Sequence, residues 1–427
     1  MSDFKQLDAA ALKAIQSKLQ QRYNEFKAKN LKLDMTRGKP SSEQLDLSLG
    51  MIDILSQKDY KADDGTDCRN YGLLDGLTEA KELFAEYLEV EPQEIIIGGN
   101  SSLALMHDTI TRAMLHGVPG SDTPWCKLPK VKFLCPSPGY DRHFAICEHF
   151  GIEMITIELK ADGPDMDEIE KLVAGDDSIK GIWCVPRYSN PTGITYAGAV
   201  VERLAKMKTK AMDFRIFWDN AYTVHHLNGK IEPLKNLLTA CKAAQNPERV
   251  FIFGSTAKVS FAGAGIAVVA GSTANMNWLR KHIGIQTIGS DKVNQLRHVR
   301  FFKNMNGILA QMDKHAAILK PKFDLVFNIL DAELSGKNIV SYNKPGGGYF
   351  ISMDTLDGCA QKVVSMAAEA GVALTKAGAT YPYGKDPRDR NIRIAPTLPP
   401  LSELKQAMEL VAICVQLASI EKLLAAD

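Results

Sequence analysis

The sequence predicts an α/β protein with a seven-stranded, mostly parallel sheet in a large domain and a smaller α+β domain after it. From about residue 76, short apolar runs alternate with helical segments, which is typical of a parallel sheet. Most runs are continuous in hydrophobicity, as expected of strands that helices cover on both faces. Polar motifs follow the strands directly, at the edge where such sheets bind ligands.

The N-terminal segment, residues 1–50, is predicted to hold one helix and a loop and to pack with the small domain. Residues 8–28 are rich in helix formers, and their apolar residues recur at spacings of three and four. Residues 31–48 are dense in Gly, Pro and Ser, so we expect an extended loop there.

Residues 51–310 are predicted to form the large domain. Its seven apolar runs are the expected strands, at residues 94–99, 131–136, 153–159, 181–186, 215–219, 250–254 and 265–271. One helical segment separates the runs 215–219 and 250–254, which predicts a βαβ crossover. Such a crossover brings the carboxyl ends of the two strands to the same edge of the sheet.

The small domain is predicted over residues 311–427. A long helix at about 290–332 leads into it. The pattern then predicts IVSYNKPGGGYFISMD as strand and loop, a helix near 358–370, the strand NIRIAP and a terminal helix.

Composition argues against several classes of protein. The net charge of +1 gives no strong attraction for nucleic acid or an anionic membrane. No apolar run approaches the roughly 18 residues of a membrane helix, and the first residues lack the apolar core of a secretory signal. The eight cysteines have no C-x-x-C spacing and lie among apolar residues, so we expect reduced, buried thiols and a cytoplasmic location.

Two residues at the strand ends are candidates for cofactor chemistry. Lys258, in GSTAKVSFAGAG, lies among small residues, where desolvation lowers the pKa of an amine and favours Schiff-base formation with an aldehyde. Asp219 ends the run 215–219, where a carboxylate can keep a pyridine nitrogen protonated, as pyridoxal phosphate chemistry requires. The alternatives are a lysine whose ammonium reaches solvent, and an aspartate that caps a helix or forms an ion pair.

Three further residues are placed to contact a flat aromatic ring. Asn190 in SNPTG and Tyr222, three residues after Asp219, could donate hydrogen bonds to a phenolate oxygen. Tyr140 in PGY could stack on the ring. An Asx-type turn at Asn190 and an ordinary half-buried tyrosine at position 140 are the alternatives.

The GGNSS motif supplies groups that bind an anion such as phosphate. Asn100, Ser101 and Ser102 lie between a strand and the start of a helix, where amides and hydroxyls form an anion cradle. Ser255 could add a hydroxyl. A serine that caps a helix without any ligand is the alternative.

Arg393 is a candidate for binding a substrate carboxylate. It alternates with Ile392 and Ile394, so on a strand its side chain points away from both. A guanidinium there could bind a carboxylate through two hydrogen bonds. An exposed strand arginine is the alternative.

The ordered motifs GGNSS, PGY, NPTG, DNAY, STAK and RIAP resemble the fold-type I pyridoxal-phosphate aminotransferases over nearly the whole chain. TRGKPS, CRNYG, WDNAYTVHHL, STAKVSFAGAG and DKVNQLRHVRF are similar, more narrowly, to the bacterial aspartate aminotransferases of subgroup Ic. The resemblance implies a homodimer with active sites at the interface. It also implies amino transfer between L-aspartate and 2-oxoglutarate, giving oxaloacetate and L-glutamate.

The resemblance further implies roles for individual residues. The catalytic residues would be Lys258, which forms the Schiff base, Asp219 at the pyridinium nitrogen, and Tyr222. Contacts with pyridoxal 5'-phosphate are implied for Lys258, Asp219, Asn190, Tyr222, Tyr140, Asn100, Ser101, Ser102, Ser255 and, reaching the neighbouring subunit, Tyr71. The implied substrate-binding residues are Arg393, Gly38, Asn190, Arg37 and Lys292. No metal site is expected.

One position departs from this family pattern. Many members carry an arginine eight residues after the lysine, where it pairs with the phosphate, and this chain has Ile266 there. Lys292 is our candidate for replacing that charge, with a solvated helix lysine as the alternative. Four cations could bind the second carboxylate of a dicarboxylic substrate, and the sequence does not choose among them: Arg37, Lys39, Lys292 and Arg297.

Other functions fit part of the pattern. The same fold could serve a lyase, a decarboxylase, or an aminotransferase for aromatic or 2-aminoadipate substrates. A regulator that binds DNA would need a basic helix-turn-helix module, and the roughly 30 residues before TRGKP are not strongly basic. A structural protein with an inactive site is disfavoured, because every residue that the chemistry needs is present.

Overall fold

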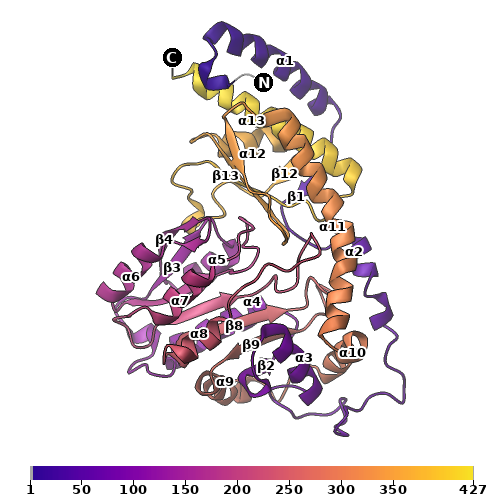
Figure 1. The fold of residues 1–427 in the computed structure, drawn as a ribbon, viewed down its shortest axis with the longest axis vertical. Coiled ribbons are helices and arrows are strands. Elements are labelled where there is room, and N and C mark those ends of the chain that lie inside the picture. The colour runs from indigo at the N-terminus through magenta and orange to yellow at the C-terminus, as the bar shows by residue number, and fades with distance from the viewer. Residues whose placement is uncertain (1–2, 427) are drawn as a thin grey trace.

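The structure, a computed structural model, describes residues 3–426 and has the α/β architecture expected from the sequence (Figure 1). The large domain is built on one sheet with strand order β2-β9-β8-β7-β6-β3-β4-β5. In chain order its strands are β2 (Ile95–Ile97), β3 (Lys132–Ser137), β4 (Glu153–Lys160), β5 (Gly163–Pro164), β6 (Ile179–Cys184), β7 (Arg215–Asp219), β8 (Val250–Ser255) and β9 (Ala267–Gly271).

Seven of these strands are the apolar runs predicted from the sequence, with ends that shift by no more than two residues. Strands β4, β3, β6, β7 and β8 pair in parallel, and β9 is antiparallel to both β8 and β2. The expected crossover is confirmed, because β7 and β8 are adjacent and parallel, with Asp219 beside Phe253. The eighth strand, β5, is a two-residue edge strand, too short to leave a pattern in the sequence.

Helices cover both faces of this sheet, which explains the continuous apolar runs. On β7, Phe217 packs into one core and Ile216 and Trp218 into the other. The Phe217 side is covered by α4 (Ser102–His116), α5 (Asp141–His149) and α9 (Thr273–Gln286). The opposite side is covered by α3 (Thr78–Leu88), α6 (Met166–Gly175), α7 (Gly198–Lys206), α8 (Leu237–Ala243) and α10 (Lys292–Phe302).

Two expectations for the remaining segments were wrong in detail. The helix expected at 290–332 is two helices, α10 and α11 (Met305–Leu334), because Lys303 adopts φ 65° and Asn304 caps the second helix. The loop expected at 31–48 contains β1 (Leu33–Met35) and the short helix α2 (Ser42–Asp46). Neither short element has a periodic pattern long enough to read.

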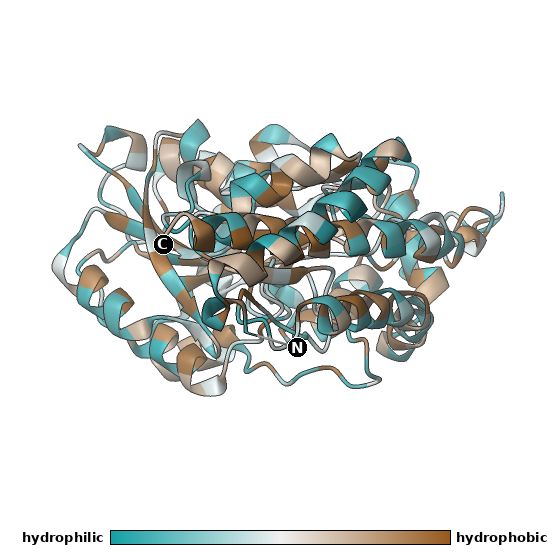
Figure 2. Cartoon of the chain, turned by 90° about the horizontal axis from the view of Figure 1, so that it is seen from above, coloured by the Kyte–Doolittle hydropathy of each residue, from teal (hydrophilic) through white to brown (hydrophobic). Residues whose placement is uncertain are grey.

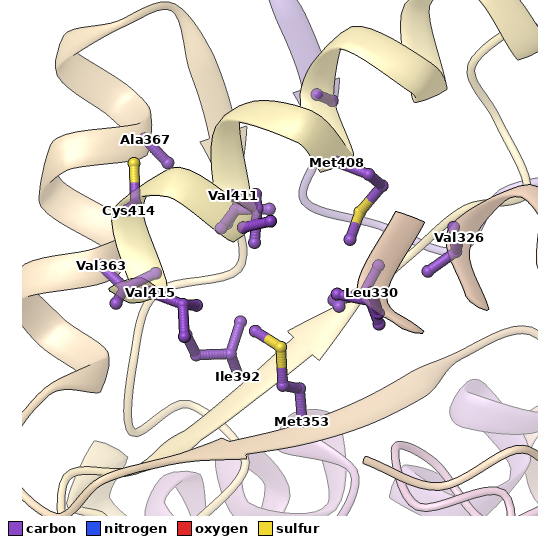
Figure 3. Close-up of a cluster of buried hydrophobic side chains, with 14 of the residues drawn as sticks. Val326, Leu330, Met353, Val363, Ala367, Ile392, Met408, Val411, Cys414 and Val415 are labelled. Atoms are coloured by element: carbon purple, nitrogen blue, oxygen red, sulfur yellow. The ribbon is translucent and has the colours of Figure 1, made fainter. Parts of the chain in front are cut away.

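The small domain is a three-stranded antiparallel sheet under long helices. Its strands, in the order β10-β11-β13, are β10 (Val340–Tyr342), β11 (Ile351–Thr355) and β13 (Asn391–Ile394). Its helices are α12 (Ala360–Glu369), α13 (Leu401–Leu424) and the C-terminal part of α11. Figure 3 shows apolar side chains of these helices meeting Met353 and Ile392 of the sheet.

The N-terminal segment lies against this small domain. Helix α1 (Ala9–Ala28) packs along α13, and β1 pairs in parallel with β12 (Val372–Leu374) (Figure 1). The Tyr23 hydroxyl donates to the carbonyl of Met366, and Arg22 pairs with Glu333 of α11. The boundaries at residues 50 and 310 remain predictions, since α11 runs from one core into the other: Met312 packs with the large domain and Leu319 with the small one.

Surface and core are divided as in an ordinary folded protein. Along the helices in Figure 2, hydrophilic and hydrophobic residues alternate, as expected when one side faces a core. Among residues 3–426, no helix combines the length and the apolar character needed to cross a membrane. All eight cysteines are free thiols, and seven are buried as the sequence predicted, but Cys126 is exposed, contrary to that prediction.

Candidate active site

A cavity of about 440 Å³ lies where the carboxyl ends of β6, β7 and β8 face the small domain. The sequence-predicted residues that line it are Arg37, Gly38, Lys39, Ser102, Tyr140, Asn190, Asp219, Tyr222, Lys258 and Arg393. They come from the N-terminal segment, from the start of α4, from the segments at and after the ends of the parallel strands β3, β6, β7 and β8, and from β13. The fold therefore brings most of the predicted site into one place.

Lys258 and Asp219 share this cavity. Asp219 is the last residue of β7, and Lys258 lies in the turn after β8, where the amide of Val259 donates to the carbonyl of Thr256 at 2.9 Å. The Lys258 Nζ atom lies 5.0 Å from the centre of the Tyr222 ring. Burial lowers the pKa of Lys258, and the nearby charge of Asp219 opposes that shift. A larger share of neutral amine makes Lys258 a better nucleophile and base.

Asp219 is held by His143, a residue that sequence reasoning missed. His143 Nε2 lies 3.0 Å from Asp219 Oδ2, and the imidazole stacks on the Trp183 indole at 4.3 Å between ring centres. The other carboxylate oxygen, Asp219 Oδ1, is buried and has no hydrogen-bond partner in residues 3–426. One carboxylate oxygen is therefore held by His143, and the other can accept a hydrogen bond from a ligand. His143 lies one helical turn after Tyr140 on α5, and that spacing is the signal that could have found it.

The two tyrosines of the cavity remain protonated over the physiological range. Burial raises the pKa of Tyr140 to about 12 and raises that of Tyr222 well above its ordinary value of 10. Each phenol can therefore donate a hydrogen bond. Asn190 lies beside them, and its side-chain oxygen accepts a hydrogen bond from Arg393 Nη1 at 3.3 Å.

The N-terminus of α4 supplies an anion-binding end to the site. Ser101 caps the helix, its hydroxyl accepting from the amide of Ala104 at 3.3 Å, and Ser102 lines the cavity. The first amides of a helix have no partner within it, so they can bind an anion. Asn100 donates its side-chain amide to the carbonyl of Gly263, and Ser255 is buried at the end of β8. These two residues shape the loops beside the cavity rather than line it.

Arg393 is nearly buried and already has several partners. Its Nη1 donates to Asp141 Oδ1 at 2.8 Å as well as to Asn190, and its Nε lies 3.4 Å from the Thr375 hydroxyl. Its guanidinium carbon lies 5.0 Å from the centre of the Phe350 ring. The sequence prediction that Arg393 lies in the site agrees with its placement, but its pairing with Asp141 was not foreseen.

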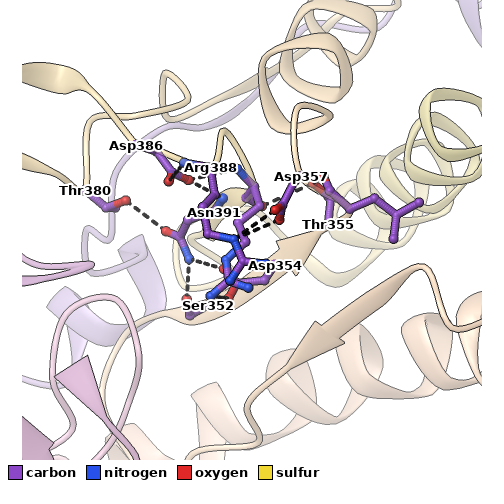
Figure 4. A network of polar contacts seen from close by, with 10 residues as sticks. Ser352, Asp354, Thr355, Asp357, Thr380, Asp386, Arg388 and Asn391 are labelled. Carbon is purple, nitrogen blue, oxygen red and sulfur yellow. Dashed lines mark hydrogen bonds and ion pairs between the residues drawn. The ribbon is translucent and has the colours of Figure 1, made fainter. Parts of the chain in front are cut away.

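A polar network fixes the strand that carries Arg393 (Figure 4). Asn391 donates its side-chain amide to Ser352 at 2.9 Å and to Asp354 at 2.8 Å, and accepts from Thr380 at 2.8 Å. Its backbone amide donates to Asp386 at 2.8 Å. Because Asn391 is two residues before Arg393 on β13, the network sets the position of the guanidinium.

Gly38 lines the cavity at a point where a larger residue would collide with a neighbouring side chain. A Cβ atom at this position would lie 2.6 Å from the Phe350 ring. The same ring faces Arg393, so the glycine lets the N-terminal loop close over the aromatic residue that supports the guanidinium.

Like Asn100, Ser101 and Ser255, three further predicted residues lie outside the cavity lining. Lys292 is buried on α10, and its ammonium donates to the carbonyl of Gly72 at 2.9 Å, so it holds the loop that carries Tyr71. Tyr71 itself is 83% exposed. Arg297 donates to Asn294 on its own helix. Ile266 is buried, so no charge takes the place of the arginine expected there.

Four exposed cations surround the mouth of the cavity: Arg37, Lys39, Arg142 and Lys376. Across residues 3–426 none of the four forms an ion pair. Arg142 and Lys376 were not predicted, because a single basic residue carries no signal of what it faces. The described part of the chain holds no group of three His, Cys, Asp or Glu residues suited to a metal ion.

Comparisons with known proteins agree with this geometry. The sequence matches the aspartate amino-transferase family over residues 7–427. An aspartate aminotransferase of Corynebacterium glutamicum is 46% identical over 414 residues, covering 97% of this chain and 96% of its own. A crystal structure of an aspartate transaminase from C. glutamicum superposes with a TM-score of 0.97 at 46% identity and 99% coverage of both chains.

A more distant structure shows the fold alone. The α-aminoadipate aminotransferase of Thermus thermophilus superposes with a TM-score of 0.73 at 20% identity, covering 92% of this chain and 93% of its own. The fold-type I architecture predicted from the motifs is thus confirmed. This chain belongs to the aspartate aminotransferase family.

Proposed function

We propose that this enzyme transfers an amino group between L-aspartate and 2-oxoglutarate, giving oxaloacetate and L-glutamate, with pyridoxal 5'-phosphate as its cofactor. One observation carries the proposal: Lys258 and the half-free carboxylate of Asp219 line the same cavity. The family membership and the name of the C. glutamicum relative support the choice of substrates.

The residues present fit this cofactor. A buried carboxylate oxygen without a partner is costly, and a protonated pyridine nitrogen would satisfy Asp219 Oδ1. Tyr140 would lie against the ring. The hydroxyls of Ser101 and Ser102 and the first amides of α4 would hold the phosphate, with Asn100 and Ser255 shaping the loops around them. With Ile266 in place of arginine, this cradle is mostly neutral.

Each residue has a task in the reaction. When bound, the cofactor supplies an aldehyde that Lys258 captures and a protonated ring that accepts the electron pair left on the substrate's Cα. The substrate's amino group would take the place of Lys258 on that aldehyde, and the released Lys258 amine, its pKa lowered by burial, would then remove the Cα proton. Tyr222 and Asn190 donate hydrogen bonds beside it, and Arg393 binds the α-carboxylate so that the Cα–H bond faces the lysine.

The cations at the mouth of the cavity favour a dicarboxylic substrate. With Arg393 on the first carboxylate, a second carboxylate would lie toward Arg37 or Arg142, both exposed and both without an ion pair among residues 3–426. Lys292 does not line this cavity, and its ammonium donates to the Gly72 carbonyl, which favours Arg37 or Arg142 for this task within one subunit. A substrate without the second carboxylate would gain nothing from these charges.

A homodimer in the cytoplasm is also part of the proposal. Tyr71 and Leu73 lie beside the segment that carries Ile285, Ile288 and Val293, since Gly289 approaches Gly72 and Lys292 binds it. These five exposed residues, the apolar patch, would be covered by a second copy, and Tyr71 would then reach the partner's phosphate site. Free thiols throughout fit a reducing compartment.

Replacing Lys258 by alanine tests the proposed function. Lys258→Ala should abolish production of oxaloacetate from L-aspartate and 2-oxoglutarate, together with the visible absorbance of the loaded enzyme, because Lys258 is the buried amine near Asp219, whereas Lys39 and Lys376 are exposed at the mouth of the cavity. The exposed Lys208→Ala is the matched control and should keep both. Wild-type turnover by Lys258→Ala would overturn the assignment. Turnover by the wild type with phenylalanine or 2-aminoadipate but not aspartate would overturn the substrate.

A further inference from the structure

We propose that Asp141 is an internal competitor for the substrate carboxylate: it occupies part of the Arg393 guanidinium in the resting enzyme and is displaced when a carboxylate ligand binds. The inference rests on the proposed role of Arg393 and adds a residue that sets the affinity of the site.

The contact between the two residues carries the proposal. Arg393 Nη1 donates to Asp141 Oδ1 at 2.8 Å, and the two residues are 252 positions apart in the sequence. The side chain of Arg393 is 5% exposed, whereas that of Asp141 is 34% exposed. Both line the cavity. The carboxylate therefore reaches the guanidinium from the cavity side, where a ligand would enter.

The hydrogen bonds of Arg393 show what a ligand must displace. Nη1 is shared by Asp141 and Asn190, and Nε faces Thr375 at 3.4 Å. A carboxylate binds arginine best through two parallel hydrogen bonds, and both forks that could provide them use Nε or Nη1 together with Nη2. A ligand carboxylate on this guanidinium would lie beside Asp141, and two like charges in a partly buried cavity repel.

The N-terminus of α5 can stabilise the Asp141 carboxylate after a ligand has displaced it from Arg393. Asp141 is the first residue of α5, where the unpaired amides and the helix dipole stabilise a carboxylate without help from Arg393. The exposed Arg142 is its neighbour in the chain and forms no ion pair among residues 3–426. Asp141 can thus be displaced without becoming an unstabilised charge, and the cost of its displacement is the lost bond to Arg393.

The competition weakens every carboxylate ligand by the same factor. A ligand that binds the fork of Nη1 and Nη2, with one carboxylate or two, removes the same Asp141–Arg393 contact, so the cost does not depend on what lies at its far end. A dicarboxylate recovers affinity because its second carboxylate meets the exposed cations at the mouth of the cavity, whereas a monocarboxylate has no second carboxylate to bind them. The enzyme would therefore bind monocarboxylic acids only weakly.

Ligand titration of the loaded enzyme tests the proposal without turnover. Propionate and succinate, with one and two carboxylates, are titrated by calorimetry into the wild type and into Asp141→Asn. The dissociation constants of both should fall in Asp141→Asn by about tenfold, the lower end of what a charge-assisted hydrogen bond contributes. Asp141→Ala should give the same direction. Asp177→Asn, an exposed carboxylate away from the cavity, should leave both constants unchanged.

Three outcomes would overturn the proposal. Unchanged constants would mean that Asp141 does not compete. Weaker binding of both acids would mean that Asp141 instead holds Arg393 in its binding position. A shift for succinate alone would place Asp141 at the distal carboxylate. Failure of the aspartate assay would overturn the proposed substrate and leave this titration intact, so the two failures are distinguishable.

Discussion

At the scale of single residues, the site depends on how each carboxylate of the cavity is partnered. Asp219 has one oxygen on His143 and one free, whereas Asp141 is paired with the arginine expected to bind substrate. The first arrangement leaves a buried acceptor that a ligand in the cavity can satisfy. The second gives a contact that a ligand must break. In the proposed function, the cofactor would therefore complete a hydrogen bond in this cavity, whereas the substrate would have to break one.

His143 should prove a positioning residue that acts through Asp219. His143→Phe keeps a ring against Trp183 but removes the hydrogen bond to Asp219 Oδ2, which leaves the buried carboxylate without a partner. We expect weaker binding of pyridoxal phosphate and a kcat about tenfold lower, since a lost hydrogen bond to a charged group costs roughly 1.5–3 kcal/mol. Titration of the apoenzyme with cofactor measures the first effect and steady-state kinetics the second.

The control for this variant is His149→Phe, on the same helix but exposed. It should leave both quantities unchanged. Cofactor affinity and kcat at wild-type values in His143→Phe would show that Asp219 does not depend on the imidazole.

Sequence reasoning found the residues that follow strands and missed those that reach the site from elsewhere. Lys258, Asp219 and Asn190 could be found because each comes after an apolar run, and parallel strands bring such residues together. Asp141 and Arg142 lie next to Tyr140, yet adjacency on a helix does not say which one faces the cavity. The partner of Lys292 could not be predicted either, because the Gly72 carbonyl belongs to a loop without a pattern.

At the scale of elements, two buried histidines fix the turn that carries Lys258. His298 of α10 lies 2.9 Å from the Ser260 hydroxyl, and His315 of α11 lies 3.2 Å from the carbonyl of Val259. Gln44 of α2 contacts His315 Nδ1 at 3.1 Å and donates to the Tyr349 hydroxyl at 2.8 Å. The consecutive helices α10 and α11 thus hold this turn, and α2, from the N-terminal segment, supports His315.

These histidines should make the enzyme less stable in mild acid. Burial lowers the pKa of both His298 and His315 from 6.5 to about 4. Between those values the unfolded chain binds a proton that the native protein does not, so stability is complete above about pH 6.5 and falls as the pH approaches 4. The loss is about 1.4 kcal/mol per pH unit for each histidine, or roughly 2 kcal/mol each between pH 6.5 and 5.

Urea unfolding from pH 7 to pH 5 measures this loss. His315→Gln, which keeps a donor for Val259, should have a shallower dependence on pH than the wild type. Equal slopes in the two proteins would mean that His315 takes up its proton in the native state.

The strands were predictable and the break between α10 and α11 was not, for a physical reason. A continuous apolar run needs two covering layers, so its cause is visible in the sequence. The break lies at Lys303 with φ 65°, followed by the cap Asn304, and neither of these residues is a glycine or a proline. Lysine in that conformation is unusual, so only the tertiary structure shows where the helix ends.

At the scale of the whole molecule, the apolar patch predicts the dimer. Ile285 is 89% exposed and lies with Tyr71, Leu73, Ile288 and Val293 on one part of the surface. Ile285→Asp should shift the protein toward monomer, since it would place a charge in an apolar interface, and should reduce activity if Tyr71 serves the neighbouring site. Sedimentation over a range of concentrations measures the shift.

Met212→Asp is the matched control, because Met212 is also an apolar residue that is 83% exposed but lies outside the patch. It should leave the oligomer unchanged. A dimer that resists Ile285→Asp, or one that Met212→Asp dissociates, would place the interface elsewhere.

The central claim is that Lys258 and Asp219 hold one aromatic cofactor between them. The most direct measurement is to load the purified enzyme with pyridoxal phosphate, reduce it with borohydride and map the modified peptide by mass spectrometry. The account predicts a phosphopyridoxyl group on Lys258, and no stable loading in Lys258→Ala. A label on another lysine, or no label at all, would contradict it.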